Sequence, residues 1–184
     1  MNDRMKLTAT FYQQDAATVA RSLLGTVLVH RRDGLVQRGR VVETEAYLGE
    51  HDLACHAAKG RTARTEVMFG PGGNAYVYLI YGLYDMLNIV TGEEGQAQAV
   101  LIRALEPLAG ITSRTDGPGR LTRALGITRR HNGLSLLGDT LYVEAGPQPE
   151  DVTVTARIGV DYAGPWKEAP LRFVAAGSSW VSRC

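Results

Sequence analysis

Residues 26–47 decide the fold, and they read TVLVHRRDGLVQRGRVVETEAY. Two runs rich in apolar and β-branched residues flank an Asp-Gly pair, which is typical of the tight turn in a β-hairpin. The pattern predicts a strand over 26–30 and a returning strand over 35–44. Glu45 and Tyr47 follow at the exit of the second strand, so their side chains share one face if the strand continues.

Outside this hairpin the chain is dominated by short strand patterns. One helix is expected after Asp15, whose side chain can cap it, and Gly25 can end it. A second, short helix is expected over 120–125. Further strands are expected over 76–80, 83–90, 99–104, 140–144, 152–158 and 171–175. We therefore predict an α+β fold: a single domain over residues 1–184 with a strand-dominated, curved antiparallel or mixed sheet, a protruding β-hairpin and a few short helices.

The composition is that of an ordinary globular protein. Hydrophobic residues make up 45% and charged residues 21% of the 184 positions. No run approaches the roughly 20 apolar residues of a membrane-spanning helix. The first residues lack the apolar core of a signal peptide, and the two cysteines are too few for a disulfide framework. These features predict a cytoplasmic protein without membrane contact.

The net charge of +1 gives no sign of a nucleic-acid partner, but the arginines are unevenly placed. Arginine makes up 17 of the 20 Lys and Arg residues, and a group of them falls within 111–131, where Asp116 is the only acid. The guanidinium fork suits phosphate oxygens. This group is either a phosphate-binding surface or a solvated one. Its members are Arg114, Arg120, Arg123, Arg129 and Arg130.

Residues 76–84, YVYLIYGLY, hold four of the chain's eight tyrosines. Gly82 predicts a tight reversal that places Tyr81 at the tip of a hairpin. These aromatic residues accompany a carboxylate, Glu45, and an arginine, Arg103. The combination predicts a pocket that stacks a flat ring and carries out chemistry beside it. Enzymes that act on nucleobases need such a pocket, because the base must leave the duplex stack to be reached.

Glu45 is the candidate general base. A carboxylate buried beside apolar rings can accept a proton from water. Glu43 lies two residues earlier and competes for this role, and a strand-end ion pair is the alternative for Glu45. Arg103, near the end of the strand predicted over 99–104, is a candidate helper or a member of a plain ion pair.

Three residues that can bind a metal ion, His51, Cys55 and His56, lie close together in the sequence and raise the question of a zinc site. A structural zinc ion takes four ligands, and no second cluster accompanies these three. We therefore expect no metal, and nothing in the sequence implies a cofactor.

Several stretches together resemble one enzyme family, the alkyladenine (3-methyladenine) DNA glycosylases. The resemblance extends from about Phe11 to Trp180, with several motifs in the family's order. The motifs are 41–49 (VVETEAYLG), 68–72 (MFGPG), 76–88, 101–108 (LIRALEPL), 117–121 (GPGRL), 156–160 (ARIGV) and 170–173 (PLRF).

The resemblance implies roles for the candidate residues in catalysis and stacking. It assigns to Glu45, rather than Glu43, the activation of the water that attacks the sugar carbon C1′. It places Arg103 near that water and the target backbone. Tyr47 and Tyr78 would stack on the flipped base, an interaction worth roughly 1–3 kcal/mol per base. An alkylated purine cation would gain more from these ring faces than a neutral base.

Other residues would bind the base edge and the DNA. By the resemblance, His56 lines the base pocket, and Asn88 stands against the purine's minor-groove edge, where guanine carries an amino group that adenine lacks. Tyr81 would fill the gap that the flipped nucleotide leaves in the duplex. Arg120 follows the helix start at Gly117, and a helix N-terminus with an arginine is a ready anion site.

The sequence therefore predicts a monofunctional DNA glycosylase of base excision repair that acts as a monomer on double-stranded DNA. It would flip alkylated or deaminated purines of the 3-methyladenine, 7-methylguanine, hypoxanthine and ethenoadenine class, hydrolyse the N-glycosidic bond and leave an abasic site. No lysine in the motifs is placed to form a Schiff base, so strand cleavage by a covalent lyase route is not expected. Two alternatives are a non-catalytic sensor of distorted DNA and a hydrolase of free nucleosides.

Overall fold

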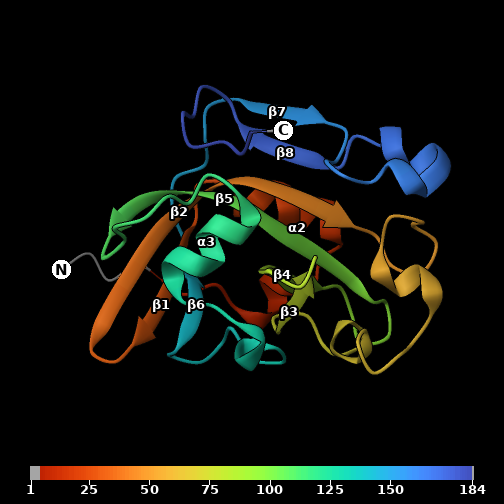
Figure 1. Cartoon of the computed structure of the whole chain (residues 1–184), viewed down its shortest axis with the longest axis horizontal. Helices are drawn as coiled ribbons and strands as arrows, with labels where there is room; N and C mark the ends of the chain where they lie inside the picture. Colours follow the sequence, from red (N-terminus) through yellow and green to blue (C-terminus); the bar gives the residue numbers. More distant parts are fainter. Residues whose placement is uncertain (1–4, 184) are drawn as a thin grey trace.

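The computed structural model describes residues 5–183, in which a curled antiparallel sheet carries a few short helices (Figure 1). At its centre, β2 (Leu35–Tyr47) pairs with β5 (Gln98–Ala109) along one edge. Its other edge pairs first with β1 (Val27–Arg32) and then, at residues 43–45, with β8 (Arg172–Ala175). The predicted α+β fold built on a curved, strand-dominated sheet is confirmed.

The sheet extends from β2 in both directions in the order β3-β4-β5-β2-β1-β6, and β7 pairs with β8 off this path. The remaining strands are β3 (Ala75–Ile80), β4 (Tyr84–Thr91), β6 (Leu141–Glu144) and β7 (Val152–Thr155). The α-helices are α1 (Ala9–Tyr12), α2 (Ala16–Leu23) and α3 (Pro118–Leu125). The 3-10 helices are η1 (His56–Lys59), η2 (Glu66–Phe69), η3 (Arg129–His131) and η4 (Asp161–Glu168). In the part of the chain that the structure describes, no helix has the length and apolar character needed to span a membrane.

Helix α2 begins where the sequence predicts it. The Asp15 carboxylate accepts a hydrogen bond from the backbone N–H of Thr18 at 3.0 Å, which satisfies one of the free donors of the first turn. The helix buries Val19, Ala20 and Leu23, and it packs against β2 and β5 (Figure 1). This packing supports the strand that carries Glu43 and Glu45 from behind.

The hairpin of β3 and β4 agrees with its predicted strands to within a residue at each end. Its turn places Tyr81 (φ 52°) and Gly82 (φ 66°) in the left-handed region, and the backbone N–H of Leu83 donates to the Ile80 carbonyl at 3.1 Å. Two successive positive φ angles match the right-handed twist of the flanking strands. A tyrosine pays steric strain for such a φ, so Tyr81 is a conformational outlier at an exposed tip.

Strand β7 ends at Thr155, three residues before the predicted end. The chain turns inward there, because Arg157 donates to the Ala46 carbonyl at 2.9 Å and the backbone N–H of Ile158 donates to the Glu45 carboxylate at 2.7 Å. These contacts, to a strand more than 100 residues earlier in the chain, take the place of the last three residues of the strand predicted over 152–158.

Candidate active site

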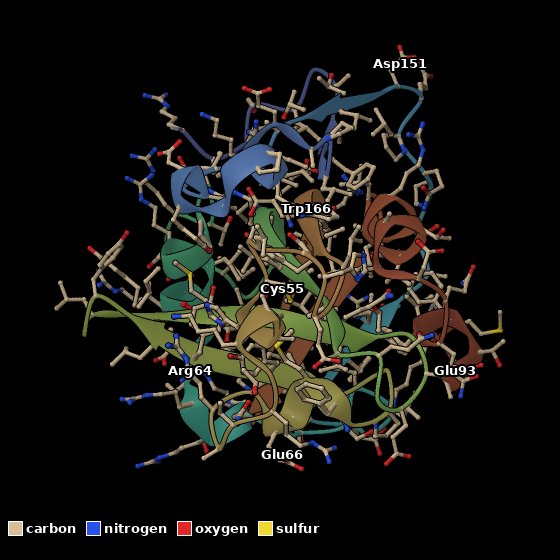
Figure 2. All side chains as sticks on the ribbon, turned by 90° about the vertical axis from the view of Figure 1, so that its right-hand side faces the viewer. Cys55, Arg64, Glu66, Glu93, Asp151 and Trp166 are labelled. Carbon is tan, nitrogen blue, oxygen red and sulfur yellow. The ribbon has the colours of Figure 1, made fainter. Side chains whose placement is uncertain are left out.

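A cleft of about 690 Å³ opens beside the β3–β4 hairpin. Its walls come from the end of β2, from η1 and the loops on either side of it, and from the hairpin. Strand β5, the start of α3 and the segment 158–162 complete them. Below it lies a smaller pocket of about 40 Å³ that shares Tyr47, His56 and Tyr78 with the cleft. Figure 2 shows the neighbourhood of Cys55, which lines both spaces, with Arg64 below it and Trp166 above.

Most of the predicted site residues meet in these two spaces. The predicted residues that line the cleft are Tyr47, His56, Tyr78, Tyr81 and Arg103. Asn88 lines the smaller pocket. Glu45 is fully buried and lines neither space, but it is hydrogen-bonded to residues that line the cleft. Arg120 lies outside both spaces.

Glu45 is held by donors from three different elements. Its Oε1 accepts the backbone N–H of Ile158 at 2.7 Å and lies 3.5 Å from Nη1 of Arg103. Its Oε2 accepts the Tyr47 hydroxyl at 2.8 Å. The expected sharing of one strand face by Glu45 and Tyr47 is therefore seen as a direct contact. Because Tyr47, Ile158 and Arg103 all line the cleft, the carboxylate is fixed just behind its surface.

Glu43, the competing carboxylate, is enclosed by a different set of partners. Its Oε1 lies 2.7 Å from Nε of Arg172 and 3.1 Å from Nε of Arg103. Ser182 donates to it twice, from its backbone N–H at 2.6 Å and from its hydroxyl at 2.8 Å. These contacts tie Glu43 to β8 and to the C-terminal segment, and the Arg103 contact fixes that guanidinium between the two glutamates.

Arg103 bridges the two glutamates because the sheet is irregular at this point. The β2–β5 register shifts between Glu43 and Thr44, and the shift leaves Arg103 at a bulge in β5. Bulges re-aim a side chain and are common beside active sites. The guanidinium is buried except for the part that lines the cleft. With Arg172 it balances the two buried carboxylates, which would otherwise repel one another.

Tyr47 rests on a buried ion pair. The guanidinium carbon of Arg157 lies 4.8 Å from the Tyr47 ring centroid, and Arg157 binds Asp52 through two bonds of 2.6 and 2.9 Å. Burial, followed by the charge of Glu45, raises the pKa of Tyr47 well above its usual range, so its hydroxyl stays protonated and donates. The sequence interpretation assigned no role to Asp52 or Arg157. The only signal for them was Arg157 inside the motif at 156–160.

Three further aromatic rings, those of His56, Tyr76 and Tyr78, form a wall of the pocket that Tyr47 also lines. The His56 and Tyr78 rings meet edge to face at 4.5 Å, and Tyr76 lies 5.4 Å from Tyr78. His56 Nδ1 and the Tyr76 hydroxyl are 3.0 Å apart. Burial lowers the pKa of His56 to about 4, and the positive charges of Arg64 and Lys59 act in the same direction. The side chains of His56, Tyr76 and Tyr78 are therefore uncharged at neutral pH.

The smaller pocket combines one amide with apolar and sulfur-bearing side chains. Asn88 donates from Nδ2 to the Tyr76 carbonyl at 3.2 Å, which fixes the amide at the pocket wall beside Cys55 and Met68. Burial raises the pKa of the Cys55 thiol to about 11, so it stays a neutral thiol. Within residues 5–183 no group of three or more His, Cys, Asp or Glu side chains is arranged to hold a metal ion.

Two members of the arginine group predicted between 111 and 131 lie beside the β3–β4 hairpin, near its turn. Arg123 lies over the Tyr84 ring at 5.6 Å, and Arg129 lies 3.4 Å from Asp85. Arg120 instead pairs with Asp116 at 3.1 Å. Hydrogen bonds from Arg114, and then from Arg120, lower the pKa of Asp116 to about 2, so this acid stays charged and offsets the local positive charge.

Comparison with known proteins gives a consistent result. Residues 10–179 match the family model described as methylpurine-DNA glycosylase (MPG). A protein of Anaeromyxobacter dehalogenans (strain 2CP-C) is 54% identical over 181 residues, covering 97% of this chain and 87% of the relative. A protein of Legionella pneumophila (strain Lens) is 51% identical over 181 residues, covering 97% of this chain and 98% of the relative. Both carry the name "Putative 3-methyladenine DNA glycosylase".

The Asp52–Arg157 pair gives a prediction for stability. Replacing Asp52 with Asn leaves a buried guanidinium without its counter-charge, which costs about 3–5 kcal/mol of unfolding free energy. Urea unfolding measures the loss. The matched control is Glu66→Gln, which removes the exposed Arg61–Glu66 pair (3.4 Å) and should cost no more than about 1 kcal/mol. Equal small losses in the two variants would show that the buried pair does not support the site.

His56 gives a prediction for pH. Its pKa falls from 6.5 in the unfolded chain to about 4 in the folded protein, so the unfolded chain takes up this proton first as the pH drops. The resulting stability is present above about pH 6.5 and is lost as the pH falls through about 4. The His56 imidazole resonance, followed by NMR, should titrate near pH 4. The unfolding free energy of His56→Gln should fall less steeply than that of the wild type between pH 6.5 and pH 4. A midpoint near 6.5 for the His56 resonance would contradict the burial argument.

Proposed function

We propose that this chain, which belongs to the methylpurine-DNA glycosylase family, removes alkylated or deaminated purines from double-stranded DNA as a monomer that cleaves only the glycosidic bond. Family membership makes it a DNA glycosylase, a hydrolytic repair enzyme that removes damaged bases. The observation that carries this proposal is the arrangement of Glu45, which accepts a hydrogen bond from the Tyr47 hydroxyl and forms an ion pair with Arg103. It lies behind an aromatic cleft whose rim bears the exposed Tyr81.

The proposed base site is the space between Tyr47 and the wall of His56 and Tyr78. A damaged purine has flat faces, and ring stacking holds it without reading its sequence. A methylated purine such as 3-methyladenine or 7-methylguanine is a cation, so electron-rich tyrosine faces and a neutral His56 favour it further. Hypoxanthine and ethenoadenine would rely on stacking alone.

Discrimination against guanine is proposed for Asn88. Its amide is fixed by the Tyr76 carbonyl at the wall of the smaller pocket. Ordinary guanine, whose edge carries an exocyclic amino group, would meet this amide by clash or with an unpaired donor, whereas an adenine-derived base would not. 7-Methylguanine meets the same amide, and its positive charge offsets that penalty through the ring faces and through its departure as a neutral base.

For catalysis, the oxygen of a water molecule would bond to C1′ of the sugar while the bond from C1′ to the purine nitrogen breaks. Glu45 would take the water's proton, and Arg103 would stabilise the charge around the carboxylate and the water. An alkylated purine cation leaves as a neutral base, whereas hypoxanthine needs a proton to leave well. Water is the proposed nucleophile because no lysine is among the described residues of the smaller pocket, and Lys59 lines only the outer cleft.

For base flipping, Tyr81 is the proposed wedge. Its side chain is 85% exposed, and its strained backbone holds it at the hairpin tip beside the cleft. Strain of this kind is retained where the surrounding structure gains a function from it. An inserted ring would fill the gap in the duplex and offset part of the unstacking cost. Arg123 and Arg129 flank the hairpin, where phosphate contacts would steady the bent duplex.

The catalytic assignment predicts the behaviour of Glu45→Gln. The amide keeps the size and polarity of the side chain but cannot accept the proton, so single-turnover release of base from a lesion duplex should fall by about 10² or more. Binding of the same duplex, measured by fluorescence anisotropy, should be retained. Near-normal turnover in this variant would remove Glu45 from the role of general base.

The wedge assignment predicts a difference between two positions of one loop. Tyr81→Ala should slow release from a paired lesion far more than from an unpaired lesion in a bulge, because unstacking then costs less. Leu83→Ala is the matched control, since Leu83 is also exposed (71%) in the same turn. If Tyr81→Ala slows both substrates equally, or if Leu83→Ala shows the same selective effect, Tyr81 is not the wedge.

A further inference from the structure

Arg64 lies over the face of Tyr78 at the mouth of the proposed base site. Its guanidinium carbon is 5.3 Å from the ring centroid, and its side chain lines the cleft while remaining exposed to solvent. Figure 2 shows Arg64 on the face of the molecule that also carries Cys55. Among residues 5–183, no carboxylate lies within ion-pair distance of Arg64. A cation thus already rests on a ring that is proposed to stack the base.

Arg61, three residues earlier in the same loop, is placed differently. It lies 5.0 Å from the Phe69 ring and 3.4 Å from Glu66, and it does not line the cleft. The two arginines share a loop, a charge and an aromatic contact, but only Arg64 holds its charge over the base site, without an acid to retain it. Its charge also acts on His56 and Tyr76. Arg64 is therefore part of the wall of the cleft.

We propose that Arg64 caps the empty base pocket and gives up its place on Tyr78 to a base only when a DNA phosphate accepts its guanidinium, so that the pocket favours a base attached to DNA over a free nucleoside. A guanidinium binds phosphate through two parallel hydrogen bonds, which are stronger than its contact with a ring face. A duplex whose nucleotide enters the cleft carries phosphates on both sides of it. A free nucleoside carries none. This inference rests on the proposed function, and it adds a means of excluding small ligands.

The expected size of the effect follows from the contact. A closed cap lowers the apparent affinity of every ligand of the pocket by the fraction of molecules in which it is open. A cation–π contact at a partly exposed site corresponds to about a two- to five-fold preference for the closed arrangement. This factor applies to every phosphate-free ligand, so the cap excludes free nucleosides in general, and the positive charge of Arg64 lowers the affinity for a cationic purine further.

The test compares Arg64→Gln with wild type and with the matched control Arg61→Gln. The phosphate-free probes are 1-methyladenosine, a purine cation, and adenosine, which is neutral, and NMR titration measures their affinities. Arg64→Gln should bind adenosine about three-fold more tightly, and the gain for 1-methyladenosine should be at least as large because a positive charge also leaves the cleft. The same variant should bind a lesion duplex more weakly, with the slope of log affinity against log salt reduced by about 1. Arg61→Gln should leave the affinities for the two nucleosides unchanged.

Opposite changes for nucleoside and duplex support the cap. Weaker binding of both would make Arg64 an ordinary substrate contact and overturn it. Unchanged nucleoside affinity, or no nucleoside binding by either protein, would also overturn it. Tighter nucleoside binding with an unchanged duplex slope would overturn the transfer to phosphate. Wild-type protein that releases no base from methylated duplex would instead count against the proposed function, and the nucleoside comparison would still report on Arg64.

Discussion

The buried charges of Glu43, Arg103 and Glu45 are the constraint on which the rest of the structure depends. Two carboxylates two residues apart on one strand can both be buried only if cations from other elements neutralise them, since an unpaired buried charge costs several kcal/mol. Arg103 comes from β5 and Arg172 from β8, and Ser182 completes the shell of Glu43. The three strands must therefore meet in one register, and that register places Glu45 behind the cleft on rigid sheet rather than on a loop.

The buried charges also fix the geometry of the aromatic pocket, through Tyr47. Tyr47 is fixed from one side by its bond to Glu45 and from another by the Asp52–Arg157 pair, while Ile158, the residue after Arg157, returns a backbone donor to Glu45. The β3–β4 hairpin contributes the uncharged ring of Tyr78 to the same pocket. Rigid charged groups on one side and uncharged aromatic rings on the other would suit the proposed reaction, in which water attacks beside a flat, cationic base.

Local patterns predicted the parts of the fold that local interactions determine. The Asp-Gly turn, the Asp15 cap and the Gly82 reversal placed the first hairpin, α2 and the tip with Tyr81, and the spacing of Glu45 and Tyr47 led to a true contact. Partners distant in sequence could not be predicted in this way. Neither the Asp52–Arg157 pair, 105 residues apart, nor the position of Arg64 over Tyr78 leaves a periodic signal. The roles of the site residues came from resemblance to a family and remain predictions, which the geometry of Glu45 and Glu43 supports.

The central claim is that this protein hydrolyses damaged purines out of duplex DNA, and one substrate comparison tests it most directly. Release of free base is measured for the same methylated purine in a duplex, in a single strand and as a nucleoside. The account predicts free purine from the duplex, with an intact strand that carries an alkali-labile abasic site, less release from the single strand and little from the nucleoside. Tight binding of the lesion duplex without release, or equal release from the nucleoside, would contradict it.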